Sequence, residues 1–125
     1  MAEKSIIKDI EQKRSQQAYL FVESVVKHDQ WDKYKSGVRK LPFYIKTNGL
    51  GQSLAFIKKR DDGWDILYKQ LSTWLQTEDV KQLVPKGELV KEVINMNSET
   101  YRQVTVETLA LLNWMRRFVD GFDTK

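Results

Sequence analysis

Apolar residues recur at steps of three and four along most of this chain, and no stretch alternates apolar and polar residues as a half-buried strand does. The clearest run covers residues 98–120, where Val106, Ala110 and Trp114 also form a second apolar edge on the opposite side. The main stripe of this run contains Tyr101, Val104, Thr105, Thr108, Leu111, Leu112, Met115 and Phe118. A helix that is apolar nearly all round is central to its bundle or touches another subunit. The pattern predicts an all-α protein, a compact bundle of five to six helices.

Start and stop signals divide the rest of the chain into further helices. We expect a long helix over residues 5–28 capped by Ser5, and a second that begins near Asp29 or Gln30 and ends at Asn48-Gly49. A short third helix opens at Gly51-Gln52-Ser53, closes on Lys58-Lys59-Arg60 and, together with the preceding residue, turns Leu50, Leu54, Phe56 and Ile57 inward. A fourth covers residues 64–76 with Asp62 as its cap, and a short fifth lies around residues 89–94. The 125 residues are enough for one domain, so we expect a single helical domain over 1–125.

Several classes of site are disfavoured by composition. Cysteine is absent, so disulfides and thiolate metal sites are excluded. His28 is the only histidine and has no second histidine to complete a metal site, while Asp61, Asp62 and Asp65 are explained by helix capping. No segment approaches the roughly 20 apolar residues of a membrane span, and the N-terminus lacks a signal-peptide pattern. We therefore expect a soluble cytoplasmic protein that is not an enzyme and holds no metal or cofactor.

Positive charge is concentrated between residues 33 and 60, which hold eight basic residues and no Asp or Glu. The net charge of the chain is +4, so the remainder carries −4. On a helical projection Lys35, Arg39 and Lys46 fall beside the apolar stripe, while Lys33 and Lys40 point to the far side. A basic stretch on an otherwise acidic chain suggests a polyanion such as nucleic acid, and a merely solvated helix face is the alternative.

Pro42 interrupts the basic helix, where a missing N–H and a steric clash predict a kink near residues 38–41. Phe43 and Tyr44 follow it and fall off the apolar stripe. A kink that turns both rings into the core explains them, as does a surface for a partner, and stacking on bases is a third possibility. Gly49-Leu50-Gly51 lacks a preceding strand and the rest of a phosphate-loop motif, so a tight turn between helices is favoured.

Two stretches together resemble the small subunit of type III-B CRISPR effector complexes, the Cmr family. The resemblance is carried by residues 39–42 and 48–56, followed by Tyr101-Arg102, Thr105, Glu107, Leu109 and residues 114–118. It implies an all-helical, non-catalytic subunit whose copies stack as an inner filament beside the backbone subunits and reach toward the large polymerase-like subunit. A basic surface of the filament would then run along the duplex of guide RNA and target RNA.

With this resemblance, the basic residues become candidates for contact with the RNA backbone. Cations neutralise phosphates without reading bases, and the guide already supplies sequence specificity. The candidates are Lys35, Arg39, Lys40, Lys46, Arg102, Arg116 and Arg117. Arg102 and Arg116 lie within roughly 40° on one helix and could line one groove. For the three arginines at positions 102, 116 and 117, a pair with Glu107 or Asp120, or a backbone cap, is the alternative.

Phe43, Tyr44 and Trp114 are the candidates for contacts with other subunits. Two other functions are compatible with the sequence. A helical DNA-binding regulator is weakened by Pro42 and by the missing signature of a recognition helix. A helical adaptor would bind a protein partner without depending on nucleic acid.

Overall fold

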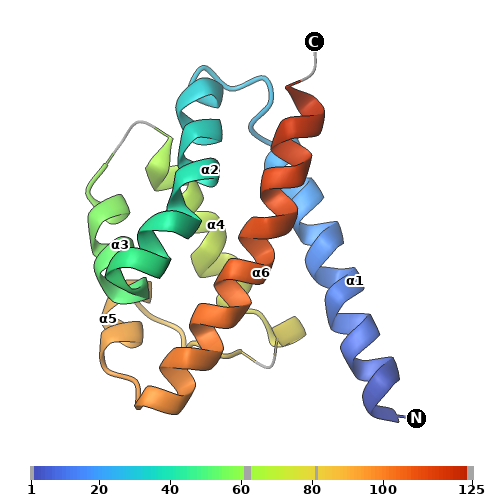
Figure 1. The fold of residues 1–125 in the computed structure, drawn as a ribbon, viewed down its shortest axis with the longest axis vertical. Coiled ribbons are helices and arrows are strands. Elements are labelled where there is room, and N and C mark those ends of the chain that lie inside the picture. The colour runs from blue at the N-terminus through green and yellow to red at the C-terminus, as the bar shows by residue number, and fades with distance from the viewer. Residues whose placement is uncertain (1, 61–62, 81, 124–125) are drawn as a thin grey trace.

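The computed structural model describes residues 2–60, 63–80 and 82–123, and Figure 1 shows these as a bundle of helices without a strand. The elements are α1 (Ala2–Glu23), α2 (Trp31–Asn48), α3 (Leu50–Lys58), α4 (Trp64–Leu75), the 3-10 turn η1 (Glu78–Val80), α5 (Leu89–Ile94) and α6 (Ser98–Phe122). The predicted all-α bundle of five to six helices is confirmed.

Helix α6 is the centre of the bundle, since it contacts α1, α2, α4 and α5. Figure 1 shows α1 on one side of it and α2 on the other. Its buried residues are Val104, Glu107, Thr108, Leu111, Leu112, Met115 and Val119. The side chain of Asn97 caps the start of α6, accepting a hydrogen bond of 2.8 Å from the Thr100 N–H. Of the second apolar edge, Val106 is 62% exposed, whereas Trp114 is half-buried and packs against the core.

Helix α2 continues through Pro42 to Asn48, and Figure 1 shows it turning away from its initial direction on the way. Gly49 then separates α2 from α3 with a φ of 88°, a conformation that favours glycine. The first turn of α3 is completed by a distant residue, because the Gly51 N–H donates to the Tyr101 hydroxyl of α6 at 2.8 Å. The tight turn between helices is therefore also a point of attachment to α6.

Three details of the sequence prediction are wrong. Helix α1 begins at Ala2, so Ser5 lies inside it and not at its cap. The same helix ends at Glu23, where i to i−3 hydrogen bonds such as His28 N–H to Val25 carbonyl tighten the chain and keep Val25 buried. Phe56 is 47% exposed, because the inward stripe of α3 is completed by other residues. The predicted cap at Asp62 lies outside the described residues.

A buried carboxylate joins three helices. Glu107 of α6 accepts hydrogen bonds from Arg14 of α1, at 2.6 Å from Nε and 2.7 Å from Nη2, and from Nε1 of Trp74 of α4 at 2.9 Å. The Glu107 side chain is 10% exposed and that of Arg14 17%. Bonding to Glu107 raises the pKa of the Arg14 guanidinium. Arg14 interrupts the apolar stripe of α1, because its guanidinium binds the buried Glu107 carboxylate.

Replacing Arg14 tests this network. Arg14→Ala leaves the Glu107 carboxylate buried without its cation, so the free energy of unfolding in urea should fall by about 3 kcal/mol. The double variant Arg14→Leu/Glu107→Leu removes both charges and should lose less than the single variant. A loss below about 0.5 kcal/mol for Arg14→Ala, as for an exposed ion pair, would contradict the buried network.

Candidate nucleic-acid interface

Helices α2 and α6 lie side by side and run antiparallel. Lys35 and Arg39, near the start of α2, face Asp123 and Asp120 near the end of α6. Farther along α2, Lys46 lines a cleft together with Arg116 of α6. The three cations predicted for one flank of α2, Lys35, Arg39 and Lys46, therefore all lie against α6. Lys35 and Arg39 face carboxylates there, whereas Lys46 lies near another cation.

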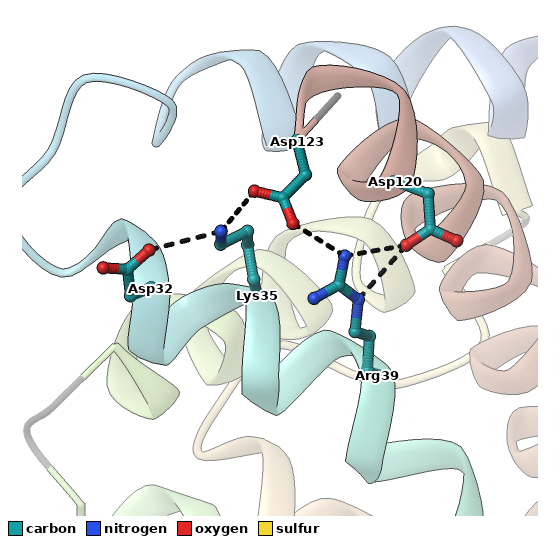
Figure 2. Close-up of polar contacts among 5 residues, drawn as sticks. All are labelled: Asp32, Lys35, Arg39, Asp120 and Asp123. Atoms are coloured by element: carbon teal, nitrogen blue, oxygen red, sulfur yellow. Dashed lines mark hydrogen bonds and ion pairs between the residues drawn. The ribbon is translucent and has the colours of Figure 1, made fainter. Parts of the chain in front are cut away.

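Lys35 and Arg39 belong to an α2–α6 carboxylate cluster made of Asp32, Lys35, Arg39, Asp120 and Asp123, which Figure 2 shows. Lys35 Nζ donates to Asp123 Oδ1 and lies 3.2 Å from Asp32 Oδ1. Arg39 donates to Asp120 Oδ1 from Nε at 3.1 Å and from Nη2 at 2.9 Å, and to Asp123 Oδ2 at 3.1 Å. Asp123 thus bridges both cations, and the cluster fastens the end of α6 to α2.

The electrostatics of this cluster stabilise its charged forms. Hydrogen bonds from Lys35 and then Arg39 lower the pKa of the Asp123 carboxyl. The same bond raises the pKa of Lys35, and bonding to Asp120 and Asp123 raises the pKa of Arg39. The Lys35 side chain is only 12% exposed. Two of the predicted RNA contacts are therefore already matched by carboxylates of the same chain.

Lys46 and Arg116 are placed differently, at the rim of the α2–α6 cleft. This cleft of about 230 Å³ is lined by Pro42, Lys46, Leu109, Leu112, Asn113 and Arg116. Both cations are exposed, and within the described ranges neither forms an ion pair or a side-chain hydrogen bond. Two like charges on an apolar floor attract an anion, and the Asn113 amide offers a further donor.

The remaining predicted cations are scattered around these two sites. Arg102 is exposed on α6, about 21 Å along the helix axis from Arg116 at 1.5 Å per residue. Arg117 is exposed but turned by about 100° from Arg116. Lys40 is exposed on the other flank of α2, beside Lys33. The three arginines of α6 do not take the carboxylate partners considered above, because Glu107 binds Arg14 and Asp120 binds Arg39.

The aromatic candidates for subunit contacts lie on two sides of the bundle. Phe43 is 66% exposed, while Tyr44 is half-buried and stacks on Trp64 with ring centroids 6.1 Å apart. The expected rotation of both rings into the core therefore holds only in part, and only for Tyr44. On the other side, Trp114 stacks on Phe118 at 5.8 Å and lines a hollow with residues of α1.

Asp123 is the residue that the sequence reasoning missed, and Asp120 was considered there only as a partner for the arginines of α6 and not for Arg39. The two aspartates are spaced i, i+3 at the end of α6, and Lys35 and Arg39 are spaced i, i+4, so each pair lies on one helix face. This matched spacing is a signal in the sequence, but it becomes readable only once α2 and α6 are known to be antiparallel neighbours.

His28 lies in the turn after α1, where its Nδ1 accepts a hydrogen bond of 3.0 Å from the Gln30 N–H. In the part of the chain that the structure describes, no group of three or more His, Cys, Asp or Glu side chains is placed to hold a metal ion. None of the described helices is long and apolar enough to cross a membrane.

Acid titration tests the carboxylate cluster. Because the folded-state pKa of Asp123 lies below the ordinary 3.8, its ionised form stabilises the fold fully above that pH. Asp123→Asn should lower the melting temperature at pH 7, and the difference from the wild type should shrink as the pH falls below about 3.8. Glu78→Gln, at an exposed carboxyl that forms no ion pair with the other residues the structure describes, serves as the control. A difference that is the same at pH 3 and pH 7 would contradict the cluster.

Comparison with known proteins identifies relatives of this chain. The CRISPR system Cmr subunit Cmr5 of Thermus thermophilus is 30% identical over 108 residues, which are 86% of this chain and 90% of that protein. The crystal structure of a CRISPR-associated Cmr5 family protein from the same species matches with a TM-score of 0.77 and 26% identity. The match covers 91% of this chain and 96% of that chain. The resemblance found in the sequence is therefore confirmed.

The match to the family as a whole extends beyond the segments that carried the resemblance. Residues 10–122 match the family described as CRISPR-associated protein (Cas_Cmr5), so the matched range includes most of α1 and the segment between α3 and α5. On this match, and on the fold that it shares with its relatives, the chain belongs to the Cas_Cmr5 family of CRISPR-associated proteins.

Proposed function

We propose that this chain is a non-catalytic structural subunit of a type III-B CRISPR effector complex, acting in the cytoplasm in antiviral defence. Its copies stack as an inner filament next to the backbone subunits and the duplex of guide RNA and target RNA. The observation that carries this proposal is membership of the Cas_Cmr5 family over residues 10–122. The relative in Thermus thermophilus bears the name of a Cmr subunit.

Within the complex, the α2–α6 cleft contacts the phosphates of the target RNA. Lys46 and Arg116 support this role because both are exposed and have no carboxylate partner among the described residues. Arg102 and Arg117 extend the basic surface along α6, and Lys40 adds positive potential from the other flank of α2. The cations of the cleft and of α6 hold the backbone of any sequence, because base pairing with the guide selects the target.

Lys35 and Arg39 contribute only after their carboxylates are displaced. Asp120 and Asp123 hold Arg39 through three charge-assisted hydrogen bonds, and Asp123 and Asp32 hold Lys35, so both cations already have the kind of contact that a phosphate would make. A target RNA must therefore compete with the end of α6 for these two cations. Their share in RNA affinity is accordingly smaller than that of Lys46 and Arg116.

Subunit contacts are proposed for the two aromatic sites, Phe43 with Tyr44 and Trp114. Phe43 and Tyr44 lie on α2 and Trp114 lies on α6 beside α1, so they serve two neighbours. A subunit inside a stacked filament needs two such surfaces, because a head-to-tail contact uses different faces of the same molecule.

Charge reversal at the cleft tests the RNA contact. Lys46→Glu/Arg116→Glu should weaken binding of target RNA by the assembled complex at every target sequence tested. Replacing both residues by alanine should also make the plot of log affinity against log salt less steep. The magnitude of its negative slope should fall by about 1.4, for two lost phosphate contacts. Filter binding at several salt concentrations measures both effects.

The matched control is Lys69→Glu/Lys91→Glu, which makes the same change of net charge at two exposed lysines outside the cleft. Circular dichroism confirms that all variants remain helical. Unchanged RNA affinity in the cleft variant, or an equal loss in the control, would refute the assignment of the cleft.

Removing the competing carboxylates should have the opposite effect. Asp120→Asn/Asp123→Asn removes both described carboxylate partners of Arg39 and one of the two of Lys35, so target RNA should bind more tightly and with a steeper salt dependence. The isolated variant should at the same time melt at a lower temperature, because the cluster no longer fastens α6 to α2. Weaker RNA binding by this variant would show that the ordered cluster, and not the freed cations, serves the RNA.

A further inference from the structure

A second surface lies on the opposite flank of α2 from the α2–α6 cleft. It consists of two adjoining hollows that share Tyr44 and Phe56 as a common wall, and we call it the aromatic groove. The larger hollow, about 420 Å³, is lined by Tyr44, Asn48, Gln52, Ser53 and Phe56. The smaller, about 220 Å³, is lined by Lys33, Ser36, Lys40, Tyr44, Phe56, Arg60 and Trp64.

The apolar part of this groove is made of the rings of Tyr44, Phe56 and Trp64, and the Phe43 ring adjoins Tyr44 beside the hollows. Phe56 meets Tyr44 and Trp64 edge-on, with centroids 5.9 Å and 6.0 Å apart, and Phe43 lies 6.2 Å from Tyr44. Phe43 remains 66% exposed and Phe56 47%. A contiguous exposed patch of large rings is uncommon on a soluble domain and marks an interaction surface.

Basic side chains make up the charged part of the groove that the structure describes. Lys33, Lys40 and Arg60 line the smaller hollow, and among the described residues no Asp or Glu lines either hollow. Arg60 already lies over the rings of Phe56 and Trp64, 5.4 Å and 5.7 Å from their centroids. Aromatic and arginine side chains arranged in this way are typical of protein interfaces, and the rim of cations selects an acidic partner.

A protein segment fits this surface better than a nucleobase does. Tyr44 and Trp64 stack on each other at an interplanar angle of 17°, and Arg60 covers Phe56 and Trp64. Much of the ring surface on which a base would stack is therefore occupied. An apolar side chain can pack against ring edges, and the amides of Asn48 and Gln52 can bond to its backbone.

We propose that the aromatic groove binds an acidic segment of another protein subunit of the effector complex. A large apolar side chain of that segment enters the larger hollow against Tyr44 and Phe56, and its carboxylates pair with Lys33 and Lys40. This inference rests on the proposed function, because the partner belongs to the same complex. It adds the location of the docking site and the chemistry of the partner segment.

Photo-crosslinking in the assembled complex tests the proposal. The crosslinker p-benzoylphenylalanine is placed at Phe43 and, separately, at Gln52, which is exposed at the larger hollow. Val106 of α6, 62% exposed and outside the groove, carries the same crosslinker as the control. Mass spectrometry of the irradiated complex should find one segment of another subunit, rich in Asp or Glu, joined to both groove positions and not to Val106.

Charge reversal provides the second measurement. Lys33→Glu/Lys40→Glu should reduce the crosslink yield at Gln52 by about tenfold, while Lys69→Glu/Lys91→Glu, the same change of charge outside the groove, should leave it unchanged. Circular dichroism of each isolated variant shows that the helices are intact.

The outcomes separate this inference from the proposed function. A crosslink from the groove to RNA, to a second copy of this chain or to a segment without acidic residues overturns the inference alone. So does the absence of any crosslink in a complex that retains the chain. If the chain copurifies with no other subunit, the proposed function fails and the inference fails with it.

Discussion

The packing of α2 against α6 is the contact on which both the core and the charged surface depend. The two helices bury apolar side chains such as Leu41 and Leu112 on the inside. Where their outer flanks meet, the antiparallel arrangement brings the acidic end of α6 to the start of α2 and Arg116 to Lys46. One arrangement of two helices thus neutralises one half of a basic flank and leaves the other half exposed.

Concentrated positive charge in a sequence does not by itself define a binding surface. Residues 33–60 include eight cations and no acidic residue. Carboxylates from other parts of the chain nevertheless pair with several of these cations. Lys35 and Arg39 bind α6, and Lys58 pairs with Glu88 at 2.9 Å. Lys46 and Lys40 remain exposed on opposite flanks of α2, where one faces the α2–α6 cleft and the other the aromatic groove.

The sequence predicted the helices and most of their buried faces, because a period of 3.6 residues is a local property. Leu67, Leu71 and Trp74 of α4, for example, recur at this period and are buried. Contacts between distant segments were not predictable in this way. Arg14 interrupts the apolar periodicity of α1, and its guanidinium binds the Glu107 carboxylate of α6, a contact that periodicity does not reveal. Phe56 was expected in the core, but its side chain is 47% exposed. Leu54 and Ile57 are the neighbouring residues of α3 that are fully buried.

The most direct test of the central claim is a crosslinking map of the RNA on this subunit. The effector complex is purified from its host through a tag on the chain, bound to a target RNA that contains 4-thiouridine, and irradiated. We predict RNA-linked peptides from the second halves of α2 and α6, which hold Lys46 and Arg116. RNA-linked peptides confined to the aromatic groove, or none from this subunit, would contradict the claim that the α2–α6 cleft contacts the RNA.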